Sequence, residues 1–326
     1  MKILILRFSS IGDIVLTTPV VRCLKEQVSG VEVHYATKSA FKNIVSNNPY
    51  IDKVHILDHS TNALITELKN EQFDIIIDLH KNLRTKKIIW SLGVKSYSFN
   101  KLNIRKWLFV NWKLKTMPDK HIVDRYMETL IPLGVHNDEK GLDYFIPEKD
   151  VVALADLPAA FQTENYVAIA IGAQHATKRL PIEKLKELVQ KITLPIVLLG
   201  GKDDSPMAEE LVASYPSKSL ILNTCGKYNL NQSASIVQQA AYLYTHDTGL
   251  MHIAAAFKKR IVSIWGNTVP EFGMYPYKTE YVAWQVENLP CRPCSKIGYN
   301  SCPKKHFKCM KDQTLPVHEI EAAWKK

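Results

Sequence analysis

The sequence predicts an α/β protein made of two doubly wound, Rossmann-like domains that face each other across a cleft. In both halves of the chain, short apolar runs alternate with helical segments, which is typical of parallel strands with helices on both faces. The chain has 326 residues, 46% of them hydrophobic, which suits two cores of roughly 150 residues each. Residues 143–163 have no clear period and contain Pro147 and Pro158, so we place the linker there. The predicted domains are residues 1–155 and 156–326.

The first domain is expected to begin with a buried strand at residues 2–8, a tight turn at 9–12 and a helix at 13–27. The alternation then continues with strands at 31–36, 53–57 and 73–79 and with helices at 39–46, 62–70, 83–92 and 123–133. Gly93 and Gly134 follow the last two helices, and glycine accepts the left-handed conformation of a helix C-cap.

The second domain repeats this alternation without a close repeat in sequence. Its expected strands are residues 166–172, 195–201, 219–222, 240–244 and 260–265, and its expected helices are 182–191, 206–215, 232–239 and 253–257.

The stretch at residues 245–256, THDTGLMHIAAA, joins a strand to a helix made of small residues. In an open parallel sheet, ligands bind where strand ends meet helix starts, because the first N–H groups and the helix dipole point into that crevice. Thr248 can cap the helix, and Gly249 allows a phosphate to approach the backbone. His246 and His252 could face the hydroxyls of a ligand. The alternative is a helix start that binds nothing.

Residues 81–120 are strongly basic, with eleven Lys or Arg against one acid, Asp119. The whole chain has a formal charge of +10, which favours an anionic partner. Within this segment, residues 103–115 mix Trp107 and Trp112 with basic residues, as in a helix that rests on an anionic bilayer surface. The alternative is a solvated basic face with both tryptophan rings in the core. No nucleic-acid-binding motif accompanies the charges, so we expect no nucleic-acid partner.

The first residues contain only a short apolar run, Ile3 to Leu6, before Arg7, and no later stretch approaches the roughly 20 apolar residues of a membrane span. We therefore expect a cytoplasmic protein that is peripheral on the inner membrane.

Several segments together resemble the glycosyltransferase family 9 heptosyltransferases of lipopolysaccharide assembly. They are MKILILRFSSIGDIVLTTPVVRCLK at the start, IGAQHATKRLP at residues 171–181, LLGGKDD at 198–204 and HDTGLMHIAAAFKKRIVSIWGNTVP at 246–270. The resemblance implies a two-domain GT-B fold. It also implies an ADP-heptose donor in the second domain and a phosphorylated glycolipid acceptor of the lipid A and core type in the first. Transfer would invert the anomeric centre without a metal ion or another cofactor.

On the acceptor side, Asp13 matches the general base of the family. A carboxylate at a helix N-terminus beside a flexible turn can take the proton of an acceptor hydroxyl. The alternative is that Asp13 only caps the helix. We place Ser10, Gly12 and Arg84 at the acceptor site.

The residues that match the donor site are Gln174, Lys178, Asp247, Thr248, Gly249, Leu250 and His252. By the resemblance, Lys178 neutralises the pyrophosphate and Gln174 contacts the same phosphates. The backbone after Asp247 cradles the phosphate, whereas the side chains of Asp247 and His252 hold the sugar hydroxyls.

The chain departs from the family pattern in two places. Leu180 stands before Pro181 where the family usually has a Trp-Pro pair. This difference should leave the phosphate contact intact. The acidic residue that holds the ribose is either Asp203 or Asp204.

Four of the six cysteines, Cys291, Cys294, Cys302 and Cys309, cluster near the C-terminus with His306 among them. In a cytoplasmic chain such a cluster indicates either a structural zinc site or reduced core cysteines.

Other function classes remain open on the sequence. The same scaffold serves sugar-nucleotide epimerases and transferases that use other nucleotide sugars. A nicotinamide enzyme would place G-x-G-x-x-G after the first strand, where this chain has Ser9-Ser10-Ile11-Gly12. A non-catalytic, basic membrane-binding module would explain the tryptophans but not Asp13, Lys178 and Asp247 together.

Overall fold

The computed structural model describes residues 1–324 and contains two parallel sheets, each in its own compact unit. The first unit is Met1–Leu102 with Asp119–Pro147. The second unit is Asn103–Pro118 together with the chain from Glu148 onward. The sequence put the boundary eight residues later and assigned residues 103–118 to the first domain, whereas in the structure that segment packs with the second unit.

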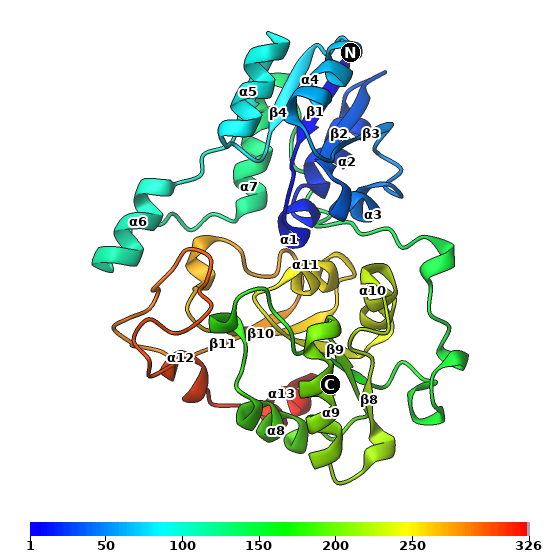
Figure 1. Ribbon diagram of the computed structural model, residues 1–326, viewed down its shortest axis with the longest axis vertical. Coiled ribbons are helices and arrows are strands. Elements are labelled where there is room, and N and C mark those ends of the chain that lie inside the picture. Colours follow the sequence, from blue (N-terminus) through cyan, green and yellow to red (C-terminus); the bar gives the residue numbers. More distant parts are fainter. Residues whose placement is uncertain (325–326) are drawn as a thin grey trace. The chain divides into compact units, whose positions relative to one another are not determined.

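The first unit has a five-stranded sheet in the order β3-β2-β1-β4-β5 (Figure 1). Its strands are β1 (Lys2–Leu6), β2 (Glu32–Lys38), β3 (Lys53–Leu57), β4 (Ile75–Asp78) and β5 (Lys95–Ser98). Its helices are α1 (Ile11–Val15), α2 (Thr18–Gln27), α3 (Lys42–Val45), α4 (Thr61–Lys69), α5 (Leu83–Leu92) and α7 (Ile122–Met127), with 3-10 turns η1 (Ser39–Phe41) and η2 (Glu128–Leu133).

The expected helix at residues 13–27 is wrong as a single helix, because the chain forms α1 and α2 with a break between them. Pro19 lies in the first turn of α2. Proline has no N–H to donate, and its ring would clash with the carbonyl of Val15 in a continuous helix. The break leaves α1 as a short helix directly after β1, with Asp13 in its first turn.

The second unit has a six-stranded sheet in the order β11-β10-β9-β6-β7-β8. Its strands are β6 (Val167–Ala170), β7 (Ile196–Leu199), β8 (Ile221–Asn223), β9 (Tyr242–His246), β10 (Arg260–Trp265) and β11 (Tyr281–Gln285). Its helices are α6 (Asn103–Trp112), α8 (Ile182–Lys191), α9 (Ser205–Ser214), α10 (Leu230–Gln239), α11 (Gly249–Ala256), α12 (Lys308–Lys311) and α13 (Val317–Trp324). Its 3-10 turns are η3 (Glu148–Asp150), η4 (Leu154–Asp156), η5 (Ala159–Phe161), η6 (Ala176–Lys178), η7 (Lys202–Asp204), η8 (Lys218–Leu220) and η9 (Pro270–Phe272).

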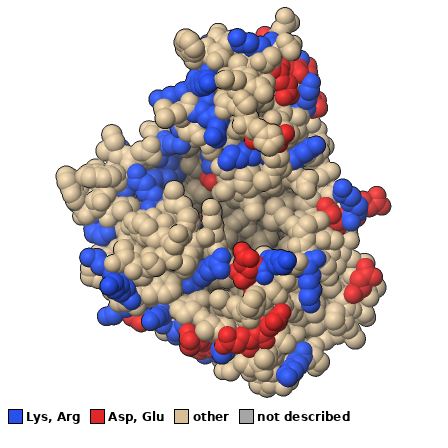
Figure 2. Space-filling view, in the orientation of Figure 1, with Lys and Arg blue, Asp and Glu red and all other residues tan. Residues whose placement is uncertain are grey.

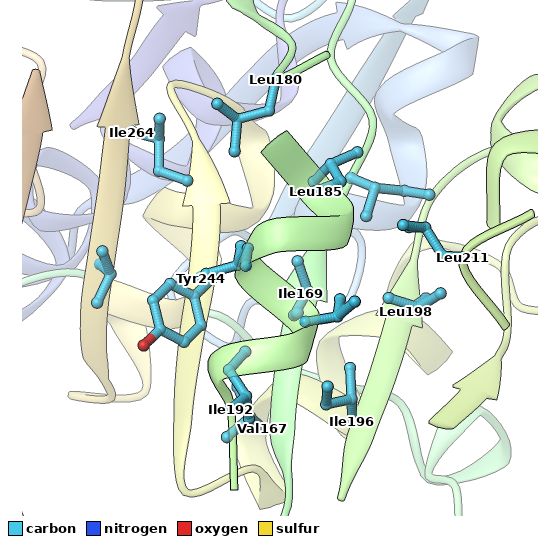
Figure 3. Close-up of a cluster of buried hydrophobic side chains, with 14 of the residues drawn as sticks. Val167, Ile169, Leu180, Leu185, Ile192, Ile196, Leu198, Leu211, Tyr244 and Ile264 are labelled. Carbon is cyan, nitrogen blue, oxygen red and sulfur yellow. The ribbon is translucent and has the colours of Figure 1, made fainter. Parts of the chain in front are cut away.

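The core of the second unit lies between α8 and the sheet (Figure 3). Leu185 of α8 and Ile192, which follows the end of this helix, pack with Ile169 and Leu198 of the central strands. Leu180, which replaces the expected tryptophan, is buried in the same cluster. A smaller side chain therefore fills this position without exposing the core.

Each sheet reverses its strand order at one point. In the first unit this switch lies between β1 and β4, and in the second between β6 and β9. Ligands of doubly wound sheets bind in the crevice outside the carboxyl ends of the strands at the switch. Within residues 1–324, no helix is both long and apolar enough to cross a membrane.

Candidate active site

The crevice of the second unit is formed by the ends of β6 and β9 and the start of α11. Thr248 takes the N-cap position of α11 with an extended backbone, but its side chain makes no capping hydrogen bond. Its hydroxyl instead lies 3.2 Å from the hydroxyl of Thr245. The N–H groups of the first helical turn, at Gly249 and Leu250, are therefore not taken by the N-cap side chain and can receive an anion together with the positive end of the helix dipole.

Lys178 and Asp247 meet at this crevice, as the predicted donor site requires. The Nζ of Lys178 lies 2.5 Å from Oδ2 of Asp247 and 3.2 Å from its carbonyl oxygen. Thr268 donates its hydroxyl to the same Oδ2 at 3.0 Å. Lys178 reaches the end of β9 because the turn η6 follows β6, the neighbouring strand. The structure thus brings together a lysine for an anion and a carboxylate for hydroxyl groups.

The other predicted donor residues lie around this pair in different environments. Gln174 is exposed on the loop after β6. His252 is buried on α11.

The expectation that His246 faces ligand hydroxyls is wrong. Its Nε2 accepts a hydrogen bond from the backbone N–H of Leu180 at 3.0 Å, and its Nδ1 lies 3.5 Å from the carbonyl of Gly172. Burial lowers the pKa of His246 to about 4, so the ring stays neutral. His246 therefore connects the end of β9 by hydrogen bonds to two loop positions that follow β6.

Asp203 and Asp204, which the sequence could not tell apart, have different roles in the structure. Asp204 is buried, pairs with Nη1 of Arg179 at 2.9 Å and accepts from the N–H of Gly201 at 2.8 Å. A Cβ at Gly172 would lie 2.2 Å from the Asp204 carboxylate, so this glycine makes room for it. Asp203 is exposed and is the carboxylate that a ligand can reach.

Asp13 lies in the first turn of α1, the helix that follows β1 at the switch point of the first unit. Its Oδ1 is 2.6 Å from Nη2 of Arg7. Its Oδ2 accepts from the N–H of Ser10 at 3.2 Å and from the Ser10 hydroxyl at 2.8 Å. Ser10 is the N-cap of α1, so Asp13 takes part in the capping of this helix. Its side chain is still 25% exposed.

The three predicted acceptor residues lie in different environments. The Ser10 hydroxyl is engaged with Asp13, Gly12 is buried in α1, and Arg84 is exposed in the first turn of α5.

Two titratable groups that interact with Asp13, His80 and Lys101, were missed by sequence reasoning. Burial, together with the charges of Arg7 and Lys101, lowers the pKa of His80 to about 4, so its ring is neutral. Burial also lowers the pKa of Lys101, whose ammonium interacts with Arg7 and Asp13. The position of His80 could have indicated it, because it lies two residues after the end of β4, at the switch point.

The basic segment at residues 81–120 has exposed tryptophan rings on α5 and α6. Trp90 is the exposed ring on α5. On α6, Trp107 and Trp112 are both exposed, and their ring centroids are 5.3 Å apart. The alternative that these rings lie in the core is therefore wrong. Phe109 instead is buried against Val269 and Phe272 and fixes α6 to the second unit.

Among the residues that the structure describes, no three donor atoms of the C-terminal cysteines and His306 lie within 4.8 Å of one another. All six cysteines are free thiols, and Cys291 Sγ lies 3.8 Å from Nε2 of His306. In the part of the chain that the structure describes, the one set of three His, Cys, Asp or Glu donor atoms within 4.8 Å of one another is His34, His55 and Glu71.

That set is an internal polar network. His34 and His55 form a hydrogen bond of 2.8 Å with each other, and Lys2 and Lys53 bind Glu71 at 3.1 and 2.5 Å. The two ammonium groups already balance the carboxylate that a metal would need.

Comparison with known proteins gives consistent matches. Residues 61–305 match the model of glycosyltransferase family 9 (heptosyltransferase). Lipopolysaccharide heptosyltransferase 1 of Campylobacter coli is 23% identical over 289 residues, which cover 82% of this chain and 84% of that protein.

Two solved structures show the same fold. A glycosyl transferase family 9 protein from Veillonella parvula gives a TM-score of 0.71 at 22% identity and covers 86% of this chain and 85% of its own. The E. coli heptosyltransferase WaaC with ADP-2-deoxy-2-fluoro heptose gives a TM-score of 0.70 at 19% identity, with full coverage of both chains (100% and 100%). The predicted GT-B class, with two Rossmann-like sheets, is thereby confirmed.

Proposed function

The chain belongs to glycosyltransferase family 9 (heptosyltransferase), and on this premise we propose that it transfers a heptose from ADP-heptose to the inner core of lipopolysaccharide or lipooligosaccharide. The observation that carries the proposal is the meeting of Lys178, Asp247 and the start of α11 at the switch point of the second unit. A nucleotide sugar offers a pyrophosphate and a ring of hydroxyl groups, and this site offers partners for both.

In the proposed reaction, the second unit holds the donor. The first N–H groups of α11, from Gly249 and Leu250, and the ammonium of Lys178 bind the pyrophosphate, with Gln174 beside them. Asp247 and His252 hold the sugar hydroxyls. The positive charge of this site stabilises the ADP that leaves, so the chemistry needs no metal ion or other cofactor.

The first unit holds the acceptor, a phosphorylated glycolipid of the lipid A and core type. Asp13 accepts the proton of the attacking hydroxyl as the new bond forms on the face opposite to ADP, which inverts the anomeric centre. Ser10 and Gly12 shape the turn beside Asp13, and Arg84 supplies positive charge for an acidic group of the acceptor.

A donor screen tests this proposal against its alternatives. Thermal shift with ADP-heptose, UDP-sugars and NAD should show stabilisation by ADP-heptose alone, followed by heptose transfer to a core acceptor. A response to a UDP-sugar would favour another transferase or an epimerase. A response to none of them would favour the non-catalytic alternative.

We expect Asp203 rather than Asp204 to hold the ribose. Asp203→Ala should weaken ADP-heptose binding by about tenfold, because a hydroxyl loses a charged hydrogen-bond partner. Asp204→Ala should instead lower the free energy of unfolding by about 1.5–3 kcal/mol, because Arg179 and Gly201 lose their buried acceptor. Calorimetric titration and thermal unfolding of both variants measure the two effects. Equal loss of ADP-heptose affinity in two stably folded variants would contradict this assignment.

We also propose that the protein binds the anionic surface of the inner membrane peripherally, through the basic segment at residues 81–120, which contains α5 and α6. Leu83 and Trp90 on α5 are each 85% exposed, and Trp112 on α6 is 63% exposed. Figure 2 shows lysine and arginine side chains on the side of the first unit that carries α5. Apolar rings among basic residues suit the boundary between lipid headgroups and acyl chains.

Vesicle co-sedimentation tests this binding. Binding to anionic vesicles should weaken as salt is raised, because exposed charges are screened over about 8 Å at physiological ionic strength. Trp107→Ser with Trp112→Ser should reduce binding by about tenfold or more, because two rings no longer enter the interface. Ile131→Ser is the matched control, since Ile131 is 63% exposed but has no basic residue on its own turn, η2. Equal binding to neutral and anionic vesicles at all salt concentrations would refute the proposal.

A further inference from the structure

Arg7 is fixed in the interior of the first unit by three hydrogen bonds. Its Nε donates to the carbonyl of Ser9 at 2.7 Å, and its Nη1 donates to the carbonyl of Leu79 and to the hydroxyl of Tyr126 at 3.1 Å. These partners follow β1, follow β4 and lie on α7, respectively. The guanidinium therefore cannot turn without breaking contacts to three separate segments.

The remaining nitrogen of this guanidinium faces the carboxylate of Asp13. Nη2 of Arg7 lies 2.6 Å from Oδ1, while the N–H and hydroxyl of Ser10 bind Oδ2 on the other side. Contacts at both oxygens fix the plane of the carboxylate. A short charge-assisted hydrogen bond of this kind is strong and directional.

The charge of Arg7 is maintained despite its burial. Burial lowers the pKa of the guanidinium, but the Asp13 carboxylate and neighbouring tyrosines raise it, and the balance lies above the ordinary value. A permanent cation therefore lies beside the Asp13 carboxylate.

We propose that Arg7 is a positioning residue for the reaction: it holds the Asp13 carboxylate in the orientation that faces the acceptor hydroxyl, and Tyr126 in turn holds Arg7. This inference rests on the proposed function of Asp13. It differs from a purely structural role, which the same unit illustrates at Arg22. Arg22 is also buried, but its partners are Asp138, Asp143 and the carbonyl of Gly141.

A double-mutant cycle separates these roles. Arg7→Met should lower kcat by about 10- to 100-fold, because a misplaced base can cost about that much, and should leave the KM for ADP-heptose unchanged. Arg7→Lys should recover part of kcat, because it keeps the charge. In the Asp13→Asn background, Arg7→Met should lower kcat by less than about threefold further, because it acts through a base that is already lost.

Three controls accompany the cycle. Arg22→Met should reduce the melting temperature but should leave the kcat of the folded protein unchanged. Tyr126→Phe keeps the ring but removes one hydrogen bond to Arg7, and it should lower kcat only when Asp13 is present. This variant tests the same inference if Arg7→Met does not fold. Circular dichroism checks that each variant is folded.

The inference is overturned if the Arg7 and Asp13 effects on kcat multiply, or if folded Arg7→Met keeps wild-type kcat. It is also overturned if Arg22→Met lowers kcat as much as Arg7→Met does. These results differ from a failure of the proposed function, in which the wild-type protein itself transfers no heptose and Asp13→Asn changes nothing.

Discussion

Asp13→Asn should lower kcat by about 10² to 10⁴-fold, the usual contribution of a general base. An acceptor hydroxyl is a poor nucleophile, and the anomeric carbon gains oxocarbenium character as ADP leaves. A carboxylate can take the hydroxyl proton as the bond forms, whereas an amide cannot. The start of α1 should persist, because asparagine caps a helix about as well as aspartate and its oxygen can still accept from Ser10.

The control for this variant is its affinity for ADP-heptose, which should stay within a few-fold of wild type because the donor residues lie in the other unit. Turnover and donor affinity should therefore be measured on the same preparation. If turnover also stays near the wild-type value, Asp13 is only a helix cap. A collapse of donor affinity would instead contradict the assignment of acceptor and donor to separate units.

Lys178→Ala should lower kcat/KM by at least about 100-fold, with a part of the loss in kcat. The lysine ammonium contacts a leaving group whose negative charge grows in the transition state, and one such donor is worth about 10² to 10³ in rate. The substitution also leaves the largely buried carboxylate of Asp247 without its cation, which lies 2.5 Å away in the structure, while the Thr268 hydroxyl stays bound to it. That unpaired charge should lower donor affinity as well.

Two further variants sharpen this measurement. Lys178→Arg keeps a positive charge and should recover part of kcat. Lys186→Ala removes a surface lysine of α8 that pairs with Glu210, and it should change neither constant. Steady-state kinetics over a range of ADP-heptose concentrations gives both values. Wild-type kcat in Lys178→Ala would exclude a role for this lysine in the departure of ADP.

The sequence predicted the elements whose residues are buried on both faces or that carry a distinct start signal. β1 and β9 are continuous buried runs, and α11 follows a polar turn with Gly249. The edge strands β5 and β11 were missed, whereas the edge strands β3 and β8 were predicted. The residues of β5, KSYS, lack the apolar pattern that identifies a strand. The break between α1 and α2 was readable from Pro19, which we took as compatible with a continuous helix.

The site was predicted through residues whose types carry chemistry, such as Asp13, Lys178 and Asp247. Sequence order could not reveal which polar groups these residues contact. His246 lies next to Asp247 in the chain, but alternation along β9 turns it into the interior, where it binds Leu180 and Gly172. Arg7 likewise precedes the motif by several residues, and only the fold shows that it touches Asp13.

The pairing of Lys178 with Asp247 has a consequence for the end of the proposed catalytic cycle. In the proposed function, a donor that binds here exchanges these partners, because its phosphate takes the lysine away from the aspartate. ADP-heptose would replace what Asp247 loses with heptose hydroxyls, which ADP alone lacks. After transfer of the heptose, the aspartate and the phosphate would compete for one ammonium group. We therefore expect the same ion pair to favour the intact donor over the spent nucleotide, to limit product inhibition and to speed the return of the site to its starting condition.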